Sequence, residues 1–250
     1  MAQSGTLILG QYKVIRLLKL RDNYAAVLAV DILDRQQNIR LLNIYEGAAA
    51  RRYAPVFINL RHCPEFLGTR LSGESLIAIF AWRDVPLIDT VFFADSGQDW
   101  PTRLHYAELL FRMVLNVWDQ PVELACAAFR NTNLCVQTLD GKFWVNYCIE
   151  PTDRKLSGRE IICLAGDHAK KILLQNWNTE LPQRRFLLEM LGGRWKDAVR
   201  LNSAWNDARV QIEEAYTKRE NRLLLRRTLG RLWMNIRWKR EARESVYGKR

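Results

Sequence analysis

The fold of this chain is decided by the stretch Cys126-Ala-Ala-Phe-Arg-Asn-Thr-Asn-Leu-Cys-Val136, followed by Asp140-Gly141 and Phe143-Trp-Val-Asn-Tyr-Cys148. An Asp-Gly pair between two short apolar runs is typical of a tight turn, because glycine adopts positive φ at no steric cost. The stretch therefore predicts a loop, a short strand, a turn and a second strand. One asparagine, Asn133, immediately precedes the first strand, and another, Asn146, closes the second.

This layout resembles the catalytic loop, hairpin and metal-binding tripeptide of protein kinases, which read H-R-D-L-K-x-x-N and D-F-G. On that pattern, Cys126-Ala127-Ala128 takes the H-R-D place, Asn133 the asparagine place and Asn146-Tyr147-Cys148 the D-F-G place. Ala128 then stands where the catalytic aspartate would be, and Asn146 where a metal-binding aspartate would be. The resemblance implies a degenerate, bacterial Ser/Thr-kinase-like fold, that is, a pseudokinase.

The N-terminal part supports the resemblance independently. Apolar runs at residues 12–18, 26–31 and 39–44 predict three strands, and kinases place a glycine-rich turn between the first two. The resemblance places Lys19, Arg21 and Tyr24 at the three glycine positions. Glycine lets backbone lie against phosphate oxygens. Three side chains at these positions are therefore expected to fill the phosphate space.

The third predicted strand lacks the lysine that pairs with nucleotide phosphates in kinases. No lysine occurs between Lys19 and Lys142, so the resemblance places Leu41 or Leu42 at that position. Arg40 is the only basic residue of the strand. It would substitute only if the strand register slipped, which turns every side chain to the other face.

The remaining elements follow in the expected order. Residues 66–71 and 75–80 predict a hairpin around Ser72-Gly73-Glu74, and residues 81–84 fall at the hinge of the kinase layout. An amphipathic helix is predicted from Asp99-Trp100-Pro101 to Val117. We therefore expect an α+β class, with a bilobal protein-kinase-like fold, a small β-rich N-lobe, a reduced α-helical C-lobe and a C-terminal basic helix.

Departures from the kinase pattern set the expected domains. The only helix candidate after the third strand lies between Val56 and Pro64, and no A-P-E sequence follows Cys148. Helical periodicity at residues 181–216 is broken at Gly192-Gly193, which predicts two helices. The expected domains are the N-lobe at residues 1–81, the reduced C-lobe at 82–216 and a basic tail at 217–250.

Composition excludes several classes of protein. The chain has 250 residues, 48% of them hydrophobic, which is enough for a sizeable core. Five cysteines without C-x-x-C spacing argue against a disulfide framework or a zinc site. No apolar run is long enough to span a membrane. We expect a cytoplasmic protein, with peripheral membrane attachment as the alternative.

Positive charge is concentrated in the tail. Residues 217–250 hold 12 Lys and Arg against 3 Glu, so the tail contributes +9 to a total net charge of +11. Leu225, Leu229, Leu232, Trp233 and Ile236 recur at helical spacing, which predicts a basic amphipathic helix. The expected partner-binding residues are Arg222, Arg226, Arg227, Arg231, Trp233, Arg237, Trp238, Lys239 and Arg240.

The sequence leaves open which surface the tail contacts. Its apolar stripe can pack on the C-lobe with the charges solvated, as in most amphipathic helices. Otherwise an acidic protein surface or an anionic membrane would bind it. Nucleic acid comes last, because a single basic helix without a known motif is a weak signal.

The function expected from the sequence is a catalytically inactive scaffold or protein-interaction module. Phosphoryl transfer needs a phosphate-covering backbone, a lysine, metal ligands and an aspartate at the nucleophile. The cleft positions hold Lys19, Arg21, Tyr24, Leu42, Ala128, Asn133 and Asn146 instead. We expect no enzymatic activity, no cofactor, no nucleotide and no metal. The alternatives are a membrane-peripheral subunit of a bacterial secretion or signalling assembly and an atypical enzyme that reuses the kinase cleft.

Overall fold

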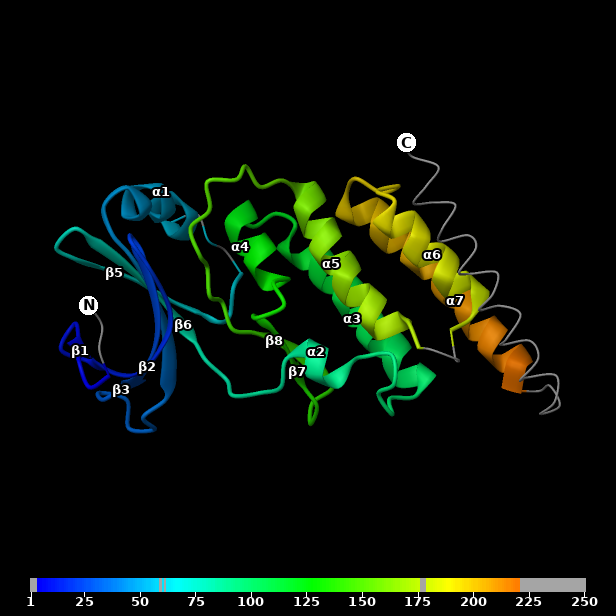
Figure 1. The fold of residues 1–250 in the computed structure, drawn as a ribbon, viewed down its shortest axis with the longest axis horizontal. Coiled ribbons are helices and arrows are strands. Elements are labelled where there is room, and N and C mark those ends of the chain that lie inside the picture. The colour runs from blue at the N-terminus through cyan, green and yellow to red at the C-terminus, as the bar shows by residue number, and fades with distance from the viewer. Residues whose placement is uncertain (1–3, 59, 61, 176–178, 221–250) are drawn as a thin grey trace. The chain divides into compact units, whose positions relative to one another are not determined.

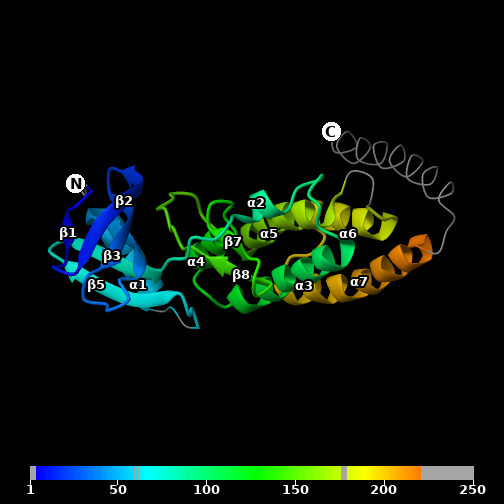
Figure 2. The ribbon, with the colours of Figure 1, turned by 90° about the horizontal axis from the view of Figure 1, so that it is seen from below.

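The computed structural model describes residues 4–58, 60, 62–175 and 179–220. It groups the chain into two compact units, each built from two separate stretches of sequence. The first unit comprises residues 1–88 and 119–157, and the second comprises residues 89–118 and 158–250. Figures 1 and 2 show the strands in the first unit and the long helices in the second. A one-turn helix, α2 (Ile88–Val91), lies at the boundary.

The first unit contains a six-stranded antiparallel sheet with the order β1-β2-β3-β4-β6-β5. The predicted strands and the predicted hairpin around Gly73 are confirmed. The strand bounds are Leu7–Ile8 (β1), Tyr12–Arg21 (β2), Tyr24–Asp31 (β3), Ile39–Tyr45 (β4), Phe66–Ser72 (β5) and Ser75–Ala81 (β6).

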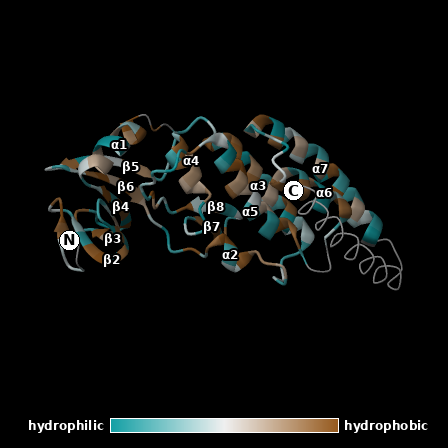
Figure 3. Ribbon diagram, turned by 45° about the horizontal axis from the view of Figure 1, so that its top comes forward, coloured by the Kyte–Doolittle hydropathy of each residue, from teal (hydrophilic) through white to brown (hydrophobic). Residues whose placement is uncertain are grey.

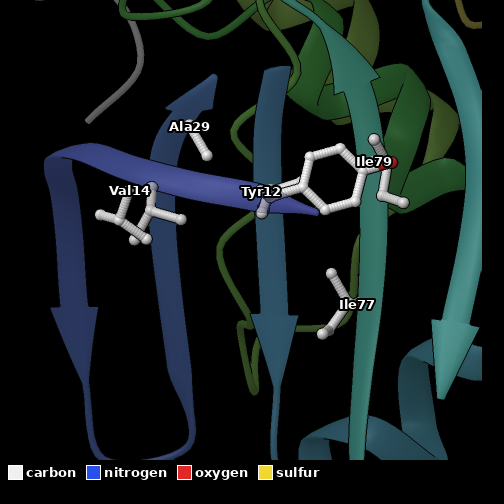
Figure 4. Close-up of a cluster of buried hydrophobic side chains, with 7 residues drawn as sticks. Tyr12, Val14, Ala29, Ile77 and Ile79 are labelled. Carbon is white, nitrogen blue, oxygen red and sulfur yellow. The ribbon is translucent and has the colours of Figure 1, made fainter. Parts of the chain in front are cut away.

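One face of this sheet carries an apolar cluster that the start of β2 crosses (Figure 4). Register shifts between Val14 and Arg16 and between Leu17 and Lys19 mark bulges, which bend a strand and increase its twist. The bend brings Tyr12 over Ile79. The buried members of the cluster are Tyr12, Val14, Val27, Ala29, Leu42, Ile77 and Ile79.

Helix α1 (Gly47–Ile58) packs against β4 and β6 and corrects one prediction. The sequence placed a helix only between Val56 and Pro64, with Pro55 outside it. Instead, Pro55 lies inside the helix. The preceding Gly47-Ala-Ala-Ala-Arg-Arg segment is rich in good helix formers. Burial of Tyr53, Val56 and Phe57 adds tertiary stabilisation that offsets the proline.

The stretch that decides the fold forms α4 (Val122–Ala128) and a hairpin of β7 (Leu134–Gln137) and β8 (Lys142–Val145). Gly141 has φ of 61° at the turn, which confirms the turn prediction. The segment after β6 runs beside β7, because the Val136 amide donates to the Pro86 carbonyl at 2.8 Å.

The second unit consists of helices α3 (Trp100–Val117), α5 (Gly158–Leu173), α6 (Leu181–Leu191) and α7 (Ala198–Glu220). The predicted start of α3 is confirmed: Asp99 caps it by accepting from the Thr102 amide at 2.9 Å, and Pro101 follows. The break at Gly192-Gly193 is confirmed as well. Hydrophobic and hydrophilic residues alternate along these helices in Figure 3.

The core of the second unit centres on Trp205. Its ring lies 4.8 Å from that of Phe111 and 5.4 Å from that of Phe186, and its indole N–H donates to Glu108 at 2.7 Å. Arg103, also buried, donates to the Phe93 carbonyl at 2.8 Å and the Ile172 carbonyl at 2.7 Å. A cation beside the last carbonyls of α5 complements the negative end of that helix.

Candidate functional site

Asn133 and Asn146, separated by the β7–β8 hairpin, lie side by side in the first unit. The Asn146 amide donates to the Asn133 carbonyl at 2.9 Å. Both side chains are buried. The hairpin thus brings together the two asparagines that the sequence placed at the metal-binding positions.

The Asn146 carboxamide uses its full hydrogen-bonding capacity within the protein. Its Oδ1 accepts from the Arg83 amide at 3.1 Å and from Trp144 Nε1 at 2.9 Å. Its Nδ2 donates to the Arg83 carbonyl at 2.9 Å and contacts Cys135 Sγ at 3.5 Å. One side chain therefore engages both backbone groups of Arg83, a residue of the predicted hinge.

The Arg83 side chain reinforces the same contact. Its guanidinium carbon lies 4.0 Å from the centre of the Trp144 ring, and its Nη1 donates to Gln137 at 2.7 Å. Such stacking adds a cation–π attraction to the hydrogen bonds. The predicted hinge and the β7–β8 hairpin are thereby joined through side chain and backbone together.

Asn133 ties loop backbone together through a buried side-chain amide, which needs hydrogen-bond partners. Its Nδ2 donates to the Ala127 carbonyl at 2.8 Å and to the Cys148 carbonyl at 3.0 Å. Its Oδ1 contacts the Thr132 hydroxyl at 3.3 Å. The neighbouring Ala128 is fully buried at the end of α4 and offers no polar side-chain atom.

Asn43 of β4 reaches the segment after β8, although nothing in the sequence marked it as a site residue. Its Nδ2 donates to the Tyr147 carbonyl at 2.8 Å, and its Oδ1 accepts from the Ile149 amide at 2.9 Å. The only signal in the sequence is a polar residue within the apolar run Ile39-Arg-Leu-Leu-Asn-Ile-Tyr45. A buried amide among apolar neighbours requires such partners.

Leu42 faces the other way, since successive residues of a strand point to opposite faces. It belongs to the apolar cluster with Val27 and Ile79. Leu41 lies on the same face as Asn43 and is fully buried, as is Leu42. Both leucines are therefore part of the hydrophobic core.

Tyr24 fills space beside Asn43. Its hydroxyl donates to Asn43 Oδ1 at 2.7 Å and lies 3.3 Å from Cys148 Sγ. Burial, followed by the nearby Cys148, raises the pKa of Tyr24 well above its ordinary value, so the phenol stays neutral. Burial likewise raises the pKa of the Cys148 thiol, although its hydrogen bond with Tyr24 opposes this.

The basic side chains of the β2–β3 hairpin pair with a carboxylate of the protein itself. Lys19 Nζ lies 3.5 Å from Glu150, and Arg21 Nη2 lies 2.9 Å from the same side chain. Both cations are substantially solvent-exposed, so each pair contributes roughly 0–1 kcal/mol. Together with Tyr24, they bring all three predicted glycine-position residues against residues 148–150.

Aromatic side chains connect β4 and α1 to the same segment. The rings of Tyr45 and Tyr53 stack with centres 4.7 Å apart. The Tyr45 hydroxyl donates to the Ile149 carbonyl at 2.8 Å, and the Tyr53 hydroxyl to the Glu150 carbonyl at 3.4 Å. Tyr147 packs on Phe80, with ring centres 5.3 Å apart. The backbone after β8 is therefore held from both β4 and α1.

The described residues hold no group of three or more His, Cys, Asp and Glu side chains that could bind a metal ion. All five cysteines are free thiols. None of the described helices has the length and apolarity needed to cross a bilayer. The predicted partner-binding residues of the tail, from Arg222 to Arg240, lie outside the described residues, and α7 ends at Glu220.

Comparison with known proteins finds no matching family model and no matching curated sequence. Solved structures do match. The kinase domain of Mycobacterium tuberculosis PknI has a TM-score of 0.53 and 12% identity, covering 83% of this chain and 100% of that domain. An apo plant pseudokinase has a TM-score of 0.56 and 10% identity, covering 84% of this chain and 98% of the other.

Both similarities extend over more than four fifths of this chain and over nearly the whole of the other chain. At such low identity they establish the fold and nothing finer. The chain has a protein kinase-like fold of the α+β class.

Proposed function

We propose that this protein is a non-catalytic, kinase-like interaction module. The observation that carries the proposal is the fully used carboxamide of Asn146, at the position where kinases place a metal-binding aspartate. Magnesium is bound through oxygen ligands, commonly carboxylates and substrate phosphates. Asn146 carries no charge, and both acceptor positions of its oxygen already receive N–H donors.

The other groups needed for phosphoryl transfer are also replaced. The side-chain amide of Asn133 donates to two loop carbonyls, and Ala128 has no side-chain group that could accept a proton. Loss of a general base alone costs about 10²- to 10⁴-fold in rate. Similarity to a structure described as a pseudokinase favours the same conclusion.

The module's partner is proposed to be a protein with an acidic surface. The support is the net charge of +9 on residues 217–250, whereas residues 1–216 are nearly neutral. Electrostatic complementarity of this kind accelerates association and makes it sensitive to salt. The proposed contact residues are the arginines, lysine and tryptophans of the tail between Arg222 and Arg240.

The catalytic part of the proposal is tested with Mg-ATP. We expect no change in Tm at millimolar Mg-ATP and no transfer of labelled phosphate to the protein or to a general substrate. A ligand at 100 times its Kd would stabilise the folded state by about 2.7 kcal/mol, which a melting curve detects. A clear rise in Tm with Mg-ATP, absent with Mg²⁺ alone, would overturn the proposal.

The partner is tested by affinity capture from the native host. We expect a specific protein to bind the full chain and to be lost when Arg226, Arg227 and Arg231 are replaced by Glu. A matched variant reverses the exposed Arg51, Lys155 and Lys196, which changes net charge equally. Capture that both triple variants reduce to the same extent would reflect net charge alone and would refute a contact in the tail.

A further inference from the structure

Two neighbouring turns at one end of the sheet in the first unit expose large aliphatic side chains. Strand β1 and the turn that follows it carry Leu7 and Leu9, which are 48% and 37% exposed. The loop after β3 carries Ile32 and Leu33, which are 45% and 72% exposed. We call these four residues the apolar turn pair. Single exposed aliphatic residues are ordinary, but a group of them on adjacent turns marks a contact surface.

Hydrogen bonds hold the two turns together. The Ile32 amide donates to the Gln11 carbonyl at 3.0 Å, and the Gln11 side chain donates to Asp31 at 3.0 Å. Asp31 also accepts from the Leu33 amide at 3.2 Å, which shapes the loop that carries the leucine. The apolar turn pair is therefore a fixed feature of the fold.

Leu9 is held in a strained backbone conformation. Its φ is +54°, a left-handed value that L-residues other than glycine, asparagine and aspartate rarely adopt. The residue is also 37% exposed, so the strained backbone leaves part of an aliphatic residue in contact with solvent. A strained and exposed leucine, followed directly by Gly10, indicates a position kept for contact rather than for stability.

Two exposed cations, Lys13 and Arg35, lie close to the apolar turn pair. Lys13 pairs with Leu7 in the β1–β2 register and is exposed, as is Arg35 beyond Leu33. The nearby carboxylates are engaged: Asp31 is buried, and Asp34 accepts from Asn38 at 2.7 Å and Arg40 at 2.9 Å. These hydrogen bonds hold the pKa of Asp34 below its ordinary value, so it stays ionised and paired.

We propose that the apolar turn pair inserts into the surface of an anionic lipid membrane, with Lys13 and Arg35 contacting the headgroups. Aliphatic side chains beside cations suit such an interface, where burial and charge attraction add. A protein partner is disfavoured, because protein interfaces concentrate their energy in Trp, Tyr and Arg and under-use Leu. The proposal goes beyond the interaction-module function and does not depend on it.

The experiment is sedimentation of the full chain with phosphatidylcholine vesicles that contain or lack phosphatidylserine. The wild type is expected to pellet with the phosphatidylserine vesicles. The substitutions Leu9→Asn and Leu33→Ser are each expected to lower the partition coefficient by about tenfold. Leu139→Ser, at the turn of the β7–β8 hairpin and 96% exposed, is the matched control and is expected to bind like the wild type.

Charge and stability give two further measurements. Replacing Lys13 and Arg35 by Glu is expected to lower binding to phosphatidylserine vesicles at least about fivefold. Leu9→Asn is expected to keep or raise the Tm, because asparagine tolerates the left-handed conformation. If Leu9→Asn binds vesicles more weakly and is at least as stable as the wild type, the loss of binding comes from the lost membrane contact and not from unfolding.

Several outcomes would overturn this proposal. They are a wild type that does not pellet, equal binding of the Leu9→Asn/Leu33→Ser double variant, and equal loss in Leu139→Ser. If only Glu substitutions at Arg226, Arg227 and Arg231 abolish binding, the membrane contact lies in the tail. If the double variant instead abolishes self-association without any vesicle binding, the turns are a contact between copies. None of these outcomes depends on the Mg-ATP result.

Discussion

The Asn146 side chain joins the end of β8 to the backbone of Arg83. An aspartate at this position has no donor, so it would leave the Arg83 carbonyl without its 2.9 Å partner and place a charge beside that oxygen. We expect Asn146→Asp to reduce the free energy of unfolding by about 1–3 kcal/mol. Urea unfolding measures this, with Asn23→Asp at an exposed turn as the control.

The Asn146→Asp variant also tests the proposed absence of Mg-ATP binding. If the aspartate produced Mg-ATP binding, a single carboxylate at this position would be sufficient for it. We expect no such gain, because Tyr24 and Asn43 still occupy the space beside residues 147–149. A variant as stable as the wild type would show that the Arg83 contact contributes little.

Glu65 gives the first unit a predictable dependence on pH. Burial raises the pKa of its carboxyl above the ordinary value of 4.5, with hydrogen bonds and Arg83 opposing the shift. The folded state thus binds the proton more tightly than the unfolded chain does. The protonated Glu65 carboxyl makes its full contribution to the free energy of unfolding below pH 4.5. This contribution declines as pH rises from there through the raised pKa.

Glu65→Gln should remove this dependence. We expect the variant to gain stability relative to the wild type as pH rises from about 4 to 7, because glutamine cannot ionise. Urea unfolding of both proteins across that range isolates the effect, since all other groups titrate alike in the two proteins. Parallel stability curves would show that the Glu65 carboxylate is adequately solvated in the folded state.

At the scale of elements, the start of α5 is limited by a neighbouring ring. A Cβ on Gly158 would lie 2.7 Å from Cη2 of Trp118, the residue that ends α3. We expect Gly158→Ala to destabilise the protein by about 1–3 kcal/mol through overpacking, although alanine favours helix by up to about 1 kcal/mol. Thermal unfolding measures the change.

Gly97→Ala is the control for that substitution, because a Cβ there would meet no atom within 4 Å. Its effect should stay within about 0.5 kcal/mol, as for most surface positions. Equal Tm values for the two variants would mean that Trp118 moves aside without cost.

Elements with strong local signals were predictable, and those set by tertiary contacts were not. Alternation and turn residues fixed the β5–β6 and β7–β8 hairpins, and Asp99 with Pro101 fixed the start of α3. Helix α1 was misplaced because Pro55 is a local helix breaker whose cost is offset by packing of Tyr53 and Phe57. The role of Asn43 was not predictable because the backbone groups that it bonds lie 104 and 106 residues away along the chain.

At the scale of the whole molecule, the two units are interleaved along the chain. Asn43 and Tyr45 of the sheet bond to residues 147–149, which lie beyond the first stretch of the second unit. The expected boundary after residue 81 therefore separates a sheet from groups that satisfy its buried polar side chains. Whether residues 1–81 fold alone is open to a direct test.

We expect a fragment of residues 1–88 to lack a cooperative unfolding transition. It would leave Asn43 Nδ2 and the Tyr45 hydroxyl without the carbonyl groups that accept from them, at about 1–3 kcal/mol for each buried polar group. Joining residues 1–88 to 119–157 with a flexible linker should restore cooperativity, as judged by urea unfolding. A sharp transition in the shorter fragment would refute the role assigned to residues 147–149.

The interleaved order of the units also matters while the chain is being made. A ribosome adds about 5–20 residues each second, so the stretch from residue 88 to residue 157 takes roughly 3 to 14 s to emerge. Until residues 147–149 emerge, the Asn43 amide and the Tyr45 phenol of β4 lack their native acceptors. Helix α3 is likewise made before the other helices of its unit. The nascent protein would then hold two unfinished cores at once, a period in which chaperones can bind and neighbouring ribosomes can bring unpaired strands together.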